Sequence, residues 1–232
     1  MDARLRAVVE EFVAARFAAA DNVIVGGSTS RGTRTASSDI DLLLIGPASM
    51  FDDGAASLAC TLEHGGEAIE VFAYTPETFR EWASKDFDAG RPVLARLLVE
   101  GTVLRNDESL RDIRSWIEER LAAGPQLTQH DLDLRRYRLT DLADDLADAI
   151  DPFEIAVVKA TFALHLAEFA LLANGEWLGS GKWLARRVLE WNPRVADDLT
   201  EAMRVADPAP LLRLFDDLLA PHGGRLHTGF VR

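Results

Sequence analysis

The chain has 232 residues, of which 48% are hydrophobic and 27% charged, and its formal net charge is -13. This composition excludes a disordered chain, and the negative charge argues against nucleic-acid binding because the phosphates would be repelled. The one cysteine, Cys60, excludes an internal disulfide, and we interpret it as a small buried hydrophobic residue.

The first twenty residues, MDARLRAVVEEFVAARFAAA, contain acidic and polar positions throughout, which is not the pattern of a signal peptide. Apolar residues between Leu5 and Phe17 recur at helical spacing and predict an amphipathic helix. No uninterrupted apolar stretch is long enough to span a bilayer. We therefore expect a cytoplasmic protein that makes no membrane contact.

Short apolar runs bounded by glycine and proline predict strands in the first half of the chain. These strands are expected at 22–25, 40–45, 68–74 and 102–104. Thr75-Pro76-Glu77 opens a helix, because proline suits the first helical turn, and a second helix is expected over 91–99. The first half therefore mixes strands with helices.

Helical periodicity dominates from Glu108 onward, with glycine and proline between the periodic segments. The expected helices lie near 108–122, 128–149, 153–173, 182–190, 194–205 and 208–220. The pattern predicts an α/β domain over residues 1–106, followed by an all-helical bundle over 107–232.

The stretch VIVGGSTSRGTRTASSDIDLLLIG carries the densest chemistry of the chain. Asp39 and Asp41 are two positions apart on a predicted strand, so their side chains leave from the same face and repel each other unless a cation lies between them. Magnesium is the natural partner, since it prefers oxygen ligands and pairs with substrate phosphates. Glu70 is the polar exception in the later strand AIEVFAY, and it would complete a three-carboxylate cluster if the two strands are neighbours.

The loop before the aspartates has the composition of a phosphate-binding loop. Gly26 and Gly27 allow backbone N–H groups to approach a phosphate closely, and Ser28 adds a hydroxyl. Arg31 and Arg34 add positive charge beside the loop, and we also expect Arg31 and Ser38 among the nucleotide-binding residues.

The order GGS, ten residues, DID and a later IEV resembles the nucleotidyltransferase superfamily of the DNA polymerase β type. The layout of the whole chain is similar to antibiotic nucleotidyltransferases of the kanamycin type, which implies an α+β fold: an α/β catalytic domain with a mixed sheet, then a C-terminal helical bundle. By this resemblance Gly27 and Ser28 contact the triphosphate, while Asp39, Asp41 and Glu70 hold two Mg²⁺ ions. The implied reaction transfers a nucleoside monophosphate, AMP from ATP, onto a hydroxyl of a small molecule and releases pyrophosphate.

The resemblance further implies an acidic general base outside the metal cluster. The segment around residues 139–150 offers several acids beside an apolar stripe of Leu139, Leu142, Leu146 and Ile150. Asp145 flanks this stripe and is the preferred base, whereas a solvated acidic face is the alternative reading.

Two further side chains in the helical half have competing interpretations. Lys182 begins a helix, which is unfavourable against the helix dipole unless the lysine meets an anion, so we expect it to bind a nucleotide phosphate; an ordinary exposed lysine is the alternative. His165 lies in the apolar segment TFALHLAEFALL and is interpreted as a core histidine.

The acceptor is left open by the sequence. The acidic surface favours a cation such as an aminoglycoside-like antibiotic, although biosynthetic or regulatory acceptors fit equally well. The alternative function is a protein adenylyltransferase or antitoxin-type regulator of a toxin–antitoxin pair, whose acceptor is a protein. A nucleotide-binding module without transfer activity is a third reading, which the complete carboxylate set disfavours.

Overall fold

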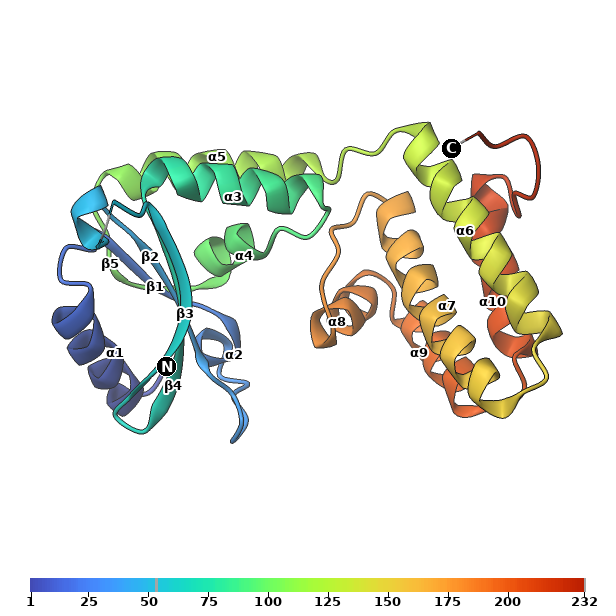
Figure 1. The fold of residues 1–232 in the computed structure, drawn as a ribbon, viewed down its shortest axis with the longest axis horizontal. Helices are drawn as coiled ribbons and strands as arrows, with labels where there is room; N and C mark the ends of the chain where they lie inside the picture. The colour runs from blue at the N-terminus through green and yellow to red at the C-terminus, as the bar shows by residue number, and fades with distance from the viewer. Residues whose placement is uncertain (53, 232) are drawn as a thin grey trace. The chain divides into compact units, whose positions relative to one another are not determined.

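The computed structural model describes residues 1–52 and 54–231, and it divides into two compact units, Met1–Ala123 and Gly124–Arg232 (Figure 1). The first contains a mixed sheet with helices and the second is helical, which confirms the predicted fold class.

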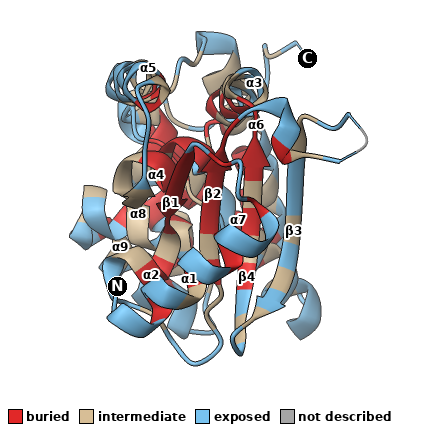
Figure 2. Cartoon of the chain, turned by 90° about the vertical axis from the view of Figure 1, so that its left-hand side faces the viewer, coloured by how far each residue is buried: buried red, intermediate tan, exposed pale blue. Residues whose placement is uncertain are grey.

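Unit 1 is built on a five-stranded sheet with the order β3-β4-β2-β1-β5. The strands are β1 (Asn22–Val25), β2 (Ile40–Ile45), β3 (Ser57–His64), β4 (Glu67–Tyr74) and β5 (Thr102–Arg105). β2 and β4 pair in parallel, whereas the other neighbours are antiparallel. β1 and β2 are buried in the middle of the sheet because their residues are apolar almost throughout (Figure 2).

β3 is the strand that the sequence analysis did not predict. It lies at the edge of the sheet, and its residues are exposed or half-buried in alternation rather than forming an apolar run. Gly65 and Gly66, with φ of +58° and +77°, form the tight turn that joins it to β4. Cys60 lies on this strand and is partly buried, not fully buried as expected.

The helices of unit 1 cover both faces of the sheet. They are α1 (Ala3–Arg16), α2 (Gly27–Arg31), α3 (Pro76–Asp88), α4 (Val93–Glu100) and α5 (Ser109–Ala123), with a short 3₁₀ helix at Ala48–Met50. α1 packs its apolar side, including Val9 and Phe12, against one face of the sheet. α3 and α4 contact β4, β2 and β1, and α2 lies beside β2.

The division between the units lies later in the chain than the boundary expected near residue 106. α5 packs against α3 and α4, so it belongs with the sheet rather than with the later helices. The Arg114 guanidinium donates a hydrogen bond to the Val99 carbonyl, and the Trp116 ring meets Phe87 edge-on at 6.1 Å. Helical periodicity alone could not show which unit this helix joins.

Unit 2 consists of α6 (Gln129–Asp148), α7 (Pro152–Ala173), α8 (Lys182–Trp191), α9 (Pro193–Arg204) and α10 (Ala209–Leu219), followed by a 3₁₀ turn at Ala220–His222. Side chains from α6, α7, α9 and α10 form a common core in which the rings of Phe162 and Phe215 lie 5.1 Å apart.

Two predictions for residues of unit 2 were wrong. Ile150 follows α6 and is 90% exposed instead of extending its apolar stripe. His165 has a 53% exposed side chain near Glu168 rather than a core position, because α7 is apolar on nearly every side and its periodicity does not mark the buried face.

Among the described residues, α7 is the one helix whose length and apolar composition would suit a membrane span. Lys159 and Glu168 interrupt its apolar sequence, and 44% of its most apolar window is buried inside the protein. Phe162 and Leu166 of this helix belong to the core of unit 2.

The start of β1 is tied to the start of α5 by a buried polar side chain. Asn22 is fully buried, and its amide donates to Asp107 at 3.2 Å and accepts from the Asp107 N–H at 2.9 Å. Asp107 also accepts hydrogen bonds from the hydroxyl and the N–H of Ser109. The Ser109 hydroxyl is the main reason that the pKa of Asp107 is lowered, and Asn22 contributes.

We expect Asp107→Ala to lower the unfolding free energy by about 1 kcal/mol at neutral pH, a modest loss because Asp107 is exposed to solvent. The pKa of Asp107 is lower in the folded protein than in the unfolded chain, where it is near 3.9. The charged carboxylate therefore stabilises the fold above about pH 3.9, and this stabilisation is lost as the pH falls through the folded-state pKa. The difference between wild type and variant should therefore shrink below about pH 4. Urea unfolding at pH 7 and pH 3 checks this; an equal difference at both pH values would contradict it.

Candidate active site

Strand pairing brings the three predicted carboxylates together. In the parallel pair of β2 and β4, Asp41 lies directly opposite Glu70, and Asp39 immediately precedes β2. One carboxylate oxygen from each of the three residues lies within 4.8 Å of those of the other two, and all three residues are half-buried. The expectation that Glu70 joins the aspartates is thus confirmed by geometry.

The cluster carries unfavourable charge repulsion. The pKa of Glu70 is raised, first because burial disfavours its charged form and then because of the negative charges of Asp39 and Asp41. Three converging carboxylates supply the hard oxygen ligands that Mg²⁺ prefers. The donor set therefore fits the metal implied by the sequence.

The glycine loop lies directly against this cluster. Gly27 has φ of +59°, and a Cβ at this position would lie 1.7 Å from Oδ2 of Asp41. The Gly26 N–H donates to the Asp41 carbonyl at 2.8 Å, and a Cβ on Gly26 would lie 2.4 Å from Leu97 of α4. Glycine is favoured at position 27 by the positive φ and by the contact with Asp41, whereas a side chain at position 26 would require the Leu97 side chain to move.

Ser28 is buried within the short α2, and its hydroxyl forms no hydrogen bond with another described residue. Thr29 donates its hydroxyl to the Asp39 carbonyl at 3.4 Å, which links α2 to the residue before β2. The loop, α2 and the first aspartate therefore form one connected element.

The predicted nucleotide-binding residues around this loop have contacts of their own. Arg31 forms an ion pair with Glu100 at the end of α4, and Glu100 also pairs with Arg96 at 2.8 Å. The Ser38 hydroxyl accepts a hydrogen bond from the Thr35 N–H at 2.9 Å, so it shapes the segment between α2 and β2. Their roles toward a nucleotide remain predictions.

Sequence reasoning did not assign a role to Glu67. This residue begins β4 and forms ion pairs with Arg34 and Arg4, which lie far from it in the sequence. The sequence around a charged residue at a strand end does not indicate whether that residue has a role at the site. Only the sheet order places it beside the loop that carries Asp39.

The two predicted residues of unit 2 lie at its surface. Asp145 is exposed on α6, while its neighbour Asp144 pairs with Arg225 and His227, both at 3.4 Å. Lys182 is exposed at the start of α8, with its ammonium 6.0 Å from the centre of the Trp183 ring. Asp145 as general base and Lys182 as phosphate ligand therefore stay predictions.

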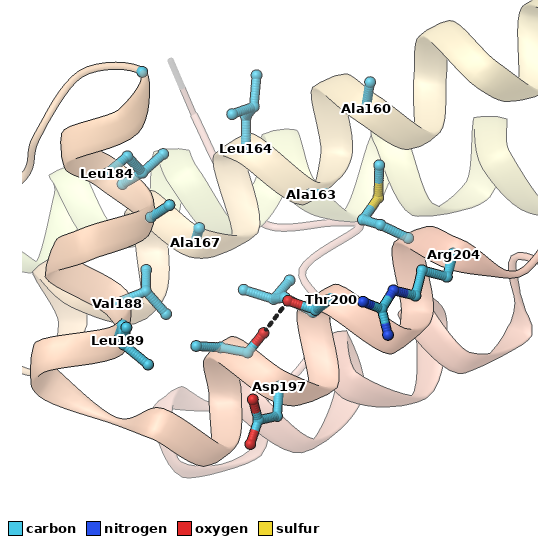
Figure 3. Close-up of a pocket in the computed structure, with 15 residues that line it drawn as sticks. Ala160, Ala163, Leu164, Ala167, Leu184, Val188, Leu189, Asp197, Thr200 and Arg204 are labelled. Carbon is cyan, nitrogen blue, oxygen red and sulfur yellow. Dashed lines mark hydrogen bonds between the residues drawn. The ribbon is translucent and has the colours of Figure 1, made fainter. Parts of the chain in front are cut away.

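Unit 2 also contains an open groove of about 880 Å³ between α7, α8 and α9 (Figure 3). Alanine, leucine and valine side chains of α7 and α8 form most of its lining. Of its polar side chains, Thr200 donates to the Ala196 carbonyl and Arg204 pairs with Glu201 at 2.7 Å. A triphosphate needs many donors, so this groove does not suit one.

Comparison with known proteins locates a family match in unit 1. Residues 7–91 match the nucleotidyltransferase domain family. No curated protein matches the chain. Among solved structures, the chain is similar to a nucleotidyltransferase-like protein from Exiguobacterium sibiricum 255-15, with 14% identity and a TM-score of 0.48 over 93% of this chain and 73% of that chain.

The matched residues include the glycine loop, both aspartates and Glu70. The match does not extend to the kanamycin type. Residues 7–91 of unit 1 are therefore similar to a nucleotidyltransferase domain.

Proposed function

We propose that this protein is a Mg²⁺-dependent nucleotidyltransferase that moves a nucleoside monophosphate, AMP from ATP, onto a hydroxyl of a small molecule. One observation carries the proposal: Asp39, Asp41 and Glu70 converge beside a glycine loop in which a Cβ on Gly27 would collide with Asp41. The family match over the same residues supports nucleotidyl transfer in general.

In the proposed reaction the acceptor oxygen bonds to the α-phosphorus, the α–β phosphoanhydride bond breaks, and pyrophosphate leaves. Asp39, Asp41 and Glu70 would hold Mg²⁺, which would supply positive charge to neutralise the triphosphate and the departing pyrophosphate. The Gly26–Ser28 loop orients the phosphates next to the carboxylates. A carboxylate takes the proton of the acceptor hydroxyl, and Asp145 is the proposed base.

The proposed acceptor is a small cationic molecule of the aminoglycoside type, because the chain carries a net charge of -13. Antibiotic resistance is one role that such a reaction would serve. The alternative acceptor is a protein, as in an antitoxin-type regulator, and a transfer assay distinguishes it from a small molecule.

A transfer assay with α-labelled ATP and Mg²⁺ tests the proposal, using small-molecule and protein fractions of a bacterial lysate as acceptors. We expect label in a small molecule, and none with Asp41→Asn. Label on a protein band would replace the proposed acceptor with a protein. Absence of Mg²⁺-dependent label from every fraction, and from purified aminoglycosides, would count against the transfer itself.

We expect Ser28→Ala to raise the KM for ATP by about 2- to 10-fold with kcat nearly unchanged, because one neutral hydrogen bond to the triphosphate is lost. Ser37→Ala is the matched control, since Ser37 is an exposed serine of the same segment. Steady-state kinetics at varied ATP measures both. An unchanged KM in Ser28→Ala would remove this hydroxyl from the nucleotide site.

A further inference from the structure

The three carboxylates are not held in the same way. Asp41 and Glu70 are fixed by the parallel pairing of β2 with β4. Asp39 lies outside the strand, at the end of a segment, residues 32–39, that forms neither helix nor strand. Its position relative to Glu70 therefore depends on what holds this segment.

Arg34 connects that segment to β4. Its guanidinium donates to the carbonyl of Ser38, the residue before Asp39, through Nη2 at 2.7 Å and Nε at 3.3 Å. The same Nη2 forms an ion pair with Glu67, three residues before Glu70 on β4. One side chain thus joins the residue next to Asp39 to the strand that carries Glu70.

Glu67 is well placed to serve as the fixed end of this connection. Its side chain is only 12% exposed, and Arg34 is 21% exposed, so their pairing is partly shielded from solvent. Arg4 of α1 also pairs with Glu67, at 2.7 Å, but is 65% exposed. Hydrogen bonds from Arg34 and Arg4 hold the pKa of Glu67 below its usual range, so the carboxylate is charged at neutral pH.

We propose that Glu67 and Arg34 form a clamp that positions Asp39 for metal binding, an inference that rests on the proposed function. Neither residue belongs to the carboxylate cluster itself. The clamp acts through the Ser38 carbonyl, as outer groups orient metal ligands in other sites.

The test measures Mn²⁺ affinity by calorimetry, with and without the non-hydrolysable analogue α,β-methylene-ATP. We expect Glu67→Gln and Arg34→Ala each to weaken Mn²⁺ binding by about 10-fold. Because the two residues act as one unit, the double variant should lose no more Mn²⁺ affinity than Arg34→Ala alone. Arg4→Ala is the matched control, because it removes the exposed partner of Glu67 and leaves Arg34 in place; a change below about 2-fold is expected.

Two further readouts separate positioning from general stability. The melting temperature of Glu67→Gln should change by no more than about 4 °C, and kcat should fall with little change in the KM for ATP. If Glu67→Gln proves unstable, Arg34→Lys supplies the second test, because lysine keeps the charge but lacks the rigid fork with which Nη2 and Nε both reach the Ser38 carbonyl. Arg34→Lys should then weaken Mn²⁺ binding by several-fold.

Asp41→Asn distinguishes the two possible failures. If it loses Mn²⁺ binding while the stable clamp variants keep wild-type affinity, the clamp is overturned and the proposed metal site stands. If Asp41→Asn binds Mn²⁺ like the wild type, the metal site is refuted and the clamp with it.

Discussion

Asp41→Asn is expected to lower the transfer rate by at least about 100-fold, because it removes one of the three proposed metal ligands. The fold should survive, since Asn has nearly the same shape and the Asp41 backbone still pairs with β4. Without metal the variant should be as stable as the wild type or slightly more stable, because one of the charges that raises the pKa of Glu70 is gone. Transfer kinetics and thermal melting in chelator measure these two effects.

The matched control is Asp21→Asn, which makes the same chemical change at an exposed position of unit 1 outside the cluster. It should retain wild-type transfer. An Asp41→Asn protein that melts normally and transfers at the wild-type rate would show that the cluster is not the metal site.

Gly27→Ala is expected to have a comparably large effect by a different route. The added Cβ would fall 1.7 Å from Oδ2 of Asp41, so either the loop or the carboxylate must move. The positive φ of +59° adds about 1–2 kcal/mol of backbone strain. We expect Mn²⁺ affinity and transfer each to fall by at least about 10-fold, since the change displaces a proposed metal ligand.

Gly32→Ala is the matched control, because it introduces the strain of a positive φ without a collision with a neighbouring side chain. Gly32 ends α2 with a similar φ of +68°, and nothing lies within 4 Å of where its Cβ would be. This variant should lose similar stability but keep Mn²⁺ affinity. Equal losses of affinity in the two alanine variants would mean that the contact between Gly27 and Asp41 is not what the site requires.

Local patterns predicted most of the secondary structure. The strands at 22–25 and 40–45 were predicted with the bounds observed, because each is a short apolar run between polar or glycine residues. The helices after residue 108 were predicted to within a residue or two, because prolines and glycines separate their periodic segments. β3 was missed because an exposed edge strand lacks an apolar run, and its signal was the Gly65-Gly66 turn beside it.

The candidate site was predictable as a set of residue types. Paired aspartates, a glycine loop and one polar residue in an apolar strand are unusual enough in sequence to indicate a metal and phosphate site. The general base, by contrast, was not predictable, because the acids near Asp145 share one helical pattern and differ only in their tertiary contacts.

The sequence by itself determined which residues could carry the chemistry, since charge, side-chain length and glycine content are local properties. The tertiary structure decided which of them meet. Asp41 and Glu70 become neighbours only because β4 pairs in parallel with β2, and Glu67 reaches Arg34 only through the same pairing. The order β3-β4-β2-β1-β5 follows from burying apolar strands under α1 on one face and α3 and α4 on the other, a requirement of the whole unit that no short segment expresses.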